Sequence, residues 1–176
     1  MSSHLQRLWR KSLALVLMLL LSACSTLGNV ANVLASAAAD AFSGEPKPAF
    51  LNWQGLMIAA DADANLNSAV ALDIVFVRDN NTLEKLQTLP AAKWFADRAE
   101  LRRTFPDALI VRSLELVPRQ ILRLSEQDLG SPRVAGVLIF GDYSTPGEHR
   151  VRLVSLRNGA LVRLGAQSFT VAEHKL

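Results

Sequence analysis

Beyond residue 50, the hydrophobic and polar positions mainly follow the two-residue period of β-strands. Five stretches are predicted as strands because their apolar and β-branched residues alternate with polar ones or run almost uninterrupted: 52–61, 71–78, 109–117, 133–143 and 149–156. A sixth covers 160–171, where Val162 and Leu164 alternate with Arg163 and Gly165. The stretch 133–143 contains few polar residues, which predicts a central strand covered on both faces.

Residues 82–105 change to a helical period. Three leucines over 83–89 are spaced by three, and Pro90 suits a helix start because its missing N–H costs nothing there. Over 91–105 the apolar residues recur at helical spacing, and Pro106 ends the pattern. The sequence therefore predicts one helical insertion between strands.

Turn signals complete the predicted architecture. Asp79-Asn80-Asn81 has the composition of a turn, and Asn158-Gly159 is the strongest hairpin signal in the chain. Roughly six strands, a helical insertion and hairpins in the C-terminal half predict a mainly β fold. We expect an antiparallel β-sandwich with a short helical insertion.

The N-terminal segment has the pattern of an export signal. A short basic stretch precedes nine apolar residues, 13–21, about half the roughly 20 that a membrane-spanning helix needs. The run ends in Leu21-Ser22-Ala23-Cys24, which resembles the lipobox of bacterial lipoproteins and contains the only cysteine. We predict a lipoprotein signal peptide over 1–23 and acylation of Cys24. The alternatives are a plain secretory signal and a buried core cysteine.

A tether is predicted over residues 24–49. It is rich in Ala, Ser and Asn and closes with Gly44, Pro46 and Pro48, a composition that buries little surface. A short amphipathic helix through Val30 and Leu34 is the alternative. The remaining residues, 50–176, are enough for one domain with its own core.

Charge changes the expected partners once the signal peptide is removed. The whole chain has 19 basic and 16 acidic residues, a net charge of +3. Three of the basic residues and none of the acidic ones fall within 1–23, so the mature chain carries 16 of each. Nucleic-acid binding depends on a basic excess. The sequence therefore excludes nucleic acid as an expected partner.

The search for catalytic or metal-binding motifs finds none that is specific. His149 is the one histidine within the domain away from its C-terminal end, and alternation predicts that it faces solvent. Asp61 and Asp63 could form an acid–base or calcium pair, but local turns explain them better. Trp94-Phe95 is expected to pin the helix to the sheet rather than to bind a ligand. We expect no enzyme activity, no metal, no cofactor except the lipid on Cys24, and no small-molecule substrate.

The order of these pieces resembles a known family. The lipobox is followed by a strand over 56–61, a polar loop DADANLNS over 61–68 and an alternating strand over 68–79. A helical stretch, SLELVP at 113–118 and a late apolar strand follow. This plan is similar to that of the outer-membrane lipoproteins of type VI secretion systems, the TssJ (SciN) family. Two departures are Arg119, where the family usually has Gly, and His149-Arg150 in place of a tryptophan-containing segment.

The resemblance implies a transthyretin-like sandwich that is anchored in the outer membrane and faces the periplasm. Ser25 after the cysteine, in place of Asp, resembles the outer-membrane sorting pattern. The implied partner is the periplasmic domain of the inner-membrane protein TssM. The implied binding loop lies between the first two strands and comprises Asp61, Asp63, Asn65, Leu66, Asn67 and Ser68. Leu66 is expected to insert into the partner; otherwise it folds back on its own sheet.

Other functions stay open at this point. One is an accessory or pilotin-type lipoprotein of another secretion or pilus assembly machine. Another is a small envelope solute-binding protein, which would need a deep pocket lined by polar residues.

Overall fold

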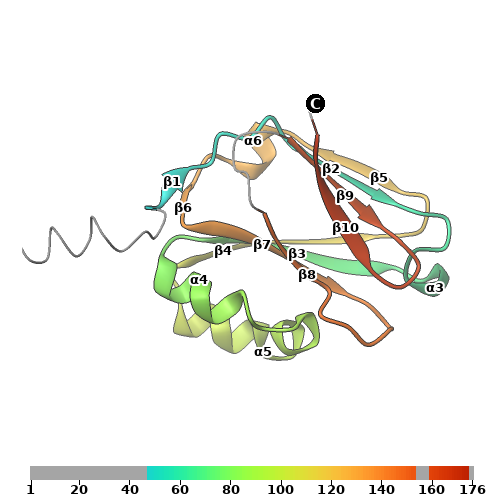
Figure 1. Ribbon diagram of the computed structural model, residues 1–176, viewed down its shortest axis with the longest axis horizontal. Helices are drawn as coiled ribbons and strands as arrows, with labels where there is room; N and C mark the ends of the chain where they lie inside the picture. The colour runs from blue at the N-terminus through green and yellow to red at the C-terminus, as the bar shows by residue number, and fades with distance from the viewer. Residues whose placement is uncertain (1–46, 154–158, 175–176) are drawn as a thin grey trace, which may run out of the picture. The chain divides into compact units, whose positions relative to one another are not determined.

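Two four-stranded β-sheets face each other in the computed structural model (Figure 1). The structure describes residues 47–153 and 159–174, without the side chain of His174, and all of them belong to the unit Pro46–Leu176. The first sheet, here the β2 sheet, has the order β10 (Phe169–His174), β9 (Gly159–Leu164), β2 (Leu56–Ala60), β5 (Ile121–Leu124). The second, the β3 sheet, has the order β4 (Leu109–Leu116), β3 (Val70–Val77), β7 (Gly136–Asp142), β8 (Arg150–Leu153).

Smaller elements complete the unit. A two-stranded sheet pairs β1 (Ala49–Phe50) with β6 (Arg133–Val134). The helices are α3 (Ala64–Asn67), α4 (Asn80–Leu86), α5 (Ala91–Thr104) and α6 (Glu126–Leu129). Strand pairs within the two large sheets are antiparallel, except that β2 and β9 run parallel. The predicted mainly β sandwich with few helices is confirmed.

Because successive side chains of a strand point to opposite faces of the sheet, the buried residues form two separate cores. Leu72, Ile74 and Phe76 on β3 point into the core between the sheets. Val75 and Val77 on the same strand face a second core beneath α4 and α5, which cover the other face of the β3 sheet (Figure 1). The central strand β7 is buried on both faces in the same way, as its few polar residues predicted.

The aromatic pair Trp94-Phe95 pins α5 to the β3 sheet, as predicted. The Trp94 side chain is fully buried and stacks on Phe140 at a centroid distance of 4.8 Å. Its Nε1–H donates to the Oδ2 of Asp73, 2.8 Å away, and Arg98 lies 3.1 Å from the same oxygen. The sequence did not single out Asp73, a buried carboxylate that joins β3 to α5.

Two predicted turns differ in the structure. Asp79-Asn80-Asn81 does not form a turn between strand and helix but begins α4, with the Asp79 carboxylate accepting the Thr82 N–H at 2.8 Å as an N-cap. The hairpin expected at Asn158-Gly159 is wrong, because β8 and β9 belong to different sheets. β8 pairs with β7 in the β3 sheet, whereas β9 pairs with β2 and β10 in the β2 sheet.

Several predictions concern residues outside those that the structure describes. These are the signal peptide 1–23, the acylated Cys24, almost all of the tether 24–49, and Asn158. Within the described residues, none of the helices combines the length and the apolar character that a membrane crossing requires.

Candidate protein-interaction surface

The loop between β2 and β3, residues 61–68, folds into the short turn α3 with an unusual backbone. Asn65, Leu66 and Asn67 all have positive φ, at 46°, 55° and 65°. Asn tolerates this left-handed region, but Leu does not, so the conformation at Leu66 costs roughly 1–2 kcal/mol. The Asn65 and Leu66 N–H groups donate to the carbonyl oxygens of Gly165 and Ala166, each at 3.1 Å. The strained turn is thus fixed against the β9–β10 turn.

Asn65 anchors the loop from a buried position. Its Nδ2 donates to the carbonyl oxygen of Ala69, and its Oδ1 accepts the Ser144 N–H, both at 2.8 Å. Only 4% of this residue is exposed, so the expectation that it offers its polar groups to a partner is wrong. Asp63, Asn67 and Ser68 are exposed.

Leu66 projects from the loop into solvent, with 54% of its surface exposed. The alternative, in which it folds back on its own sheet, does not occur. Because the backbone on either side is hydrogen-bonded, the side chain is held out on a fixed support. An apolar side chain presented in this way is suited to a protein contact, since little conformational entropy remains to be lost on binding.

The paired carboxylates Asp61 and Asp63 do not form an acid–base pair. Asp61 instead accepts the Arg163 Nε–H at 2.9 and 3.0 Å through its two oxygens. The hydrogen bond from Arg163 to this carboxylate, and then the carboxylate's charge, raise the pKa of the guanidinium. Asp61 is thereby tied to β9, whereas Asp63 is an exposed loop residue.

Two further loops at the same end of the sandwich have the same kind of backbone strain. Arg119, in the turn between β4 and β5, has φ 68°, and His149, just before β8, has φ 40°. Together with residues 65–67 they are the five non-glycine residues with positive φ in the described part of the chain. Such residues concentrate at functional sites when the surrounding structure holds them in place. All five gather around α3.

His149, which alternation predicted to face solvent, is half-buried in the structure. Its ring stacks on Tyr143 at 4.8 Å, and its Nε2–H donates to the carbonyl oxygen of Thr145 at 2.7 Å. Tyr143 in turn stacks on Phe169, 6.3 Å away. The three rings close the gap between the β7–β8 loop and the β9–β10 turn, which is a packing role.

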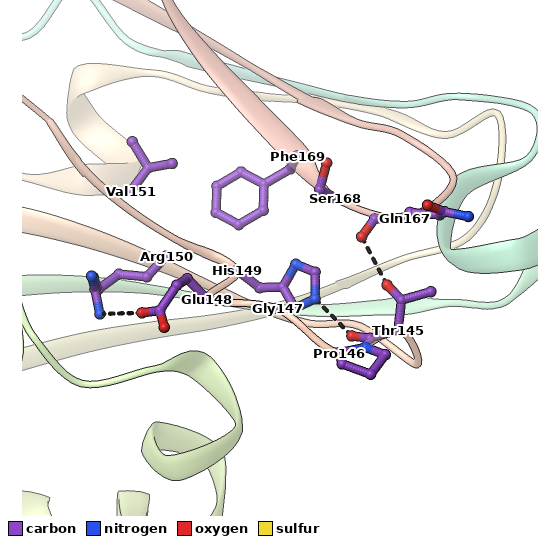
Figure 2. Close-up of a pocket in the computed structure, with 10 residues that line it drawn as sticks. All are labelled: Thr145, Pro146, Gly147, Glu148, His149, Arg150, Val151, Gln167, Ser168 and Phe169. Atoms are coloured by element: carbon purple, nitrogen blue, oxygen red, sulfur yellow. Dashed lines mark hydrogen bonds and ion pairs between the residues drawn. The ribbon is translucent and has the colours of Figure 1, made fainter.

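An open pocket of about 330 Å³ lies beside these rings, between residues 145–151 and 167–169 (Figure 2). Several of its polar groups are already paired within the chain. The Thr145 hydroxyl donates to the carbonyl of Gln167 at 2.8 Å, and Arg150 donates to the carbonyl of Leu89 at 2.7 Å and to Glu148 at 3.1 Å. A solute would have to displace these bonds, so the geometry does not favour a solute-binding site. In the described ranges, no three His, Cys, Asp or Glu side chains are grouped to hold a metal ion.

No protein-family model and no curated protein sequence matches the chain. Its structure is similar to that of the type VI secretion (T6SS) lipoprotein TssJ1 from Pseudomonas aeruginosa, with 12% identity, a TM-score of 0.51, and coverage of 73% of this chain and 98% of that one. It is also similar to a chain in a structure of the C-terminal domain of the T6SS protein TssM from EAEC, with 14% identity, a TM-score of 0.50, and coverage of 68% and 97%.

A third similar structure is Serratia marcescens Lip, a membrane-bound component of the type VI secretion system, with 13% identity, a TM-score of 0.48, and coverage of 69% and 96%. At such identities, structural likeness speaks for the fold alone. The first two structures show that this chain has a TssJ-like fold, as the order of its sequence segments predicted.

Proposed function

We propose that this chain is an outer-membrane lipoprotein of a type VI secretion system and a member of the TssJ (SciN) family. The observation that carries the proposal is the sandwich shared with TssJ1 over 98% of that chain. The lipobox at residues 21–24 supports it independently, because it supplies the membrane anchor that such a lipoprotein needs. The domain would hang from acylated Cys24 on the periplasmic side of the outer membrane.

In this role the chain binds rather than catalyses. Its partner is the periplasmic domain of an inner-membrane TssM protein, and the contact ties the trans-envelope complex to the outer membrane. The α3 loop is the proposed contact, with Leu66 as its apolar anchor and Asp63, Asn67 and Ser68 as a polar rim. Asn65 supports the loop from behind without touching the partner.

Leu66→Asp tests the binding loop. Asp accepts the left-handed conformation better than Leu, so the domain is expected to stay folded. Loss of the apolar anchor should weaken binding of the purified TssM periplasmic domain by about tenfold or more, as measured by biolayer interferometry with the detergent-solubilised lipoprotein. Phe50→Asp, at an exposed apolar residue on β1, is the matched control and should bind as the wild type does.

Equal affinity of the wild-type and Leu66→Asp proteins, with circular dichroism showing both folded, would remove the α3 loop from the proposal. Absence of any binding by the wild-type protein would reject the TssM partner altogether.

A further inference from the structure

Large exposed apolar side chains are concentrated at one end of the sandwich. Of four such residues in the described part of the chain, Leu66, Val117 and Ile121 surround the α3 end, with 54%, 55% and 58% of their surfaces exposed. The fourth, Phe50, lies on β1 at the opposite end (Figure 1). Single exposed apolar residues are ordinary on protein surfaces, but a group of three around one strained loop is the kind of patch that marks a protein-interaction site.

The β4–β5 turn that carries Val117 and Ile121 is joined directly to the start of the α3 loop. The Arg119 N–H donates to the carbonyl oxygens of Ala60 and Asp61 at 3.1 and 3.2 Å. The Ala60 N–H donates to the Gln120 carbonyl at 2.9 Å, and the Gln120 side chain accepts the Val117 N–H at 3.0 Å. The turn and the loop therefore form one continuous, hydrogen-bonded support.

The charged residues of the same segment, 117–124, are all basic. Arg119 and Arg123 are exposed, and no acidic residue occurs from Val117 to Leu124. Within the described residues neither arginine forms an ion pair. Register places Ile121 opposite Ala59 and Arg123 opposite Met57, so both point away from the core, on the outer face of the β2 sheet. This face is not covered by α4 and α5, which lie on the β3 sheet (Figure 1).

We propose that the partner of the α3 loop also docks on the β4–β5 surface, defined as Val117, Arg119, Ile121 and Arg123. The partner there presents aliphatic side chains to Val117 and Ile121, and carboxylates to the two arginines. The proposal rests on the proposed function for the existence of the partner and adds a second contact with its own chemistry. An apolar centre with charged groups at its rim is the usual composition of a specific protein interface.

Binding measurements on the full-length lipoprotein in detergent test this second contact, with the purified TssM periplasmic domain as the probe. Val117→Asp and Ile121→Asp should each weaken binding by about tenfold, with Phe50→Asp as the matched control. The double change Arg119→Glu with Arg123→Glu should slow association and reverse its dependence on salt, because both charges would then repel the partner's carboxylates.

Site-specific photocrosslinking keeps the test independent of folding defects. A photoreactive residue at position 117 or 121 should crosslink to the partner in intact cells, whereas one at position 50 should not. If Leu66→Asp weakens binding but the Val117 and Ile121 variants do not, and positions 117 and 121 fail to crosslink, the second contact is wrong and the proposed function stands. Faster association after charge reversal would overturn the proposed acidic chemistry of the partner. If every variant, including Leu66→Asp, binds as tightly as the wild type, both proposals are wrong.

Discussion

Arg119 holds a left-handed backbone conformation that a residue other than glycine rarely adopts. Its φ of 68° lies in the region that glycine enters without steric cost. The family that this sequence resembles usually has Gly at the corresponding place in the sequence, and Gly enters this region more easily than Arg does. The hydrogen bonds from its N–H to Ala60 and Asp61 hold the conformation. Arg119 therefore displays a cationic side chain from a strained backbone that these two hydrogen bonds support.

Tyr143 is the residue whose ionisation reports most directly on the packing around the loops. It is 8% exposed, and its hydroxyl has no hydrogen-bond partner among the described residues. Burial, and secondarily the negative charge of Asp61, raise the pKa of the phenol above its ordinary value of 10. The folded state therefore holds this proton more tightly than the unfolded state, and the resulting stability is present below pH 10 and is lost as the pH rises above it.

Because the chain has one tyrosine, ultraviolet titration measures Tyr143 alone. The native protein should form tyrosinate only well above pH 10, while the protein unfolded in urea should titrate near 10. Asp61→Asn should lower the native pKa while leaving it raised, since burial is the larger cause. A native titration midpoint near 10 would show that the hydroxyl is hydrated and that the three-ring cluster is open.

At the scale of elements, the sequence predicted those strands whose alternation reflects burial. The β-branched stretch 71–78 and the apolar run in 133–143 correspond to β3 and β7, which occupy the centre of a sheet. The edge strand β5 was missed, because four residues with an exposed Ile121 and Arg123 resemble a loop. Ser125 and Asp128 form a capping box that begins α6, and this spacing could have been recognised.

The failure of the hairpin prediction at Asn158-Gly159 also has a physical reason. An Asn-Gly pair favours a tight turn locally, but sheet membership is decided by what each strand buries and pairs with. Leu153 on β8 pairs with Val137 in the β3 sheet, while Ala160 on β9 pairs with Leu56 in the β2 sheet. The anchoring role of Asn65 was missed for a related reason. Its Oδ1 accepts the Ser144 N–H, and the two residues are 79 positions apart in the sequence.

The contacts of Asp73 with Trp94 and Arg98, which join β3 to α5, should contribute to the stability of the fold. Asp73→Ala should lower the free energy of unfolding by about 3 kcal/mol, because the buried Trp94 Nε1–H loses its acceptor and Arg98 its carboxylate. Asp97→Ala, on the exposed face of the same helix, removes the Lys93 pair at 2.8 Å and should change stability little. Urea unfolding followed by tryptophan fluorescence measures both. Equal effects of the two substitutions would show that Asp73 is not a structural joint.

At the scale of the whole molecule, the two ends of the sandwich are different in character. The first described residues lead into β1, beside β6, while α3 and the strained loops lie at the other end (Figure 1). The end that the chain enters from its N-terminal side has one large exposed apolar residue among those described, Phe50. The other end holds the five left-handed residues and the three exposed aliphatic side chains. Under the proposed function, the chain would come from its anchor at one end of the sandwich and bind its partner at the other.

That separation predicts that the anchor and the binding surface act independently. Replacing residues 1–24 with a cleavable secretory signal that lacks cysteine should yield a soluble periplasmic protein with the wild-type affinity for the TssM periplasmic domain. The wild-type chain should instead fractionate with the outer membrane, and mass spectrometry should find acyl chains on Cys24, since several chains together anchor firmly. Co-purification of TssM with outer-membrane fractions should then depend on both features, being lost in the soluble form and in the Leu66→Asp protein. A soluble form that still brings TssM to the outer membrane would show that the tether function does not reside in Cys24.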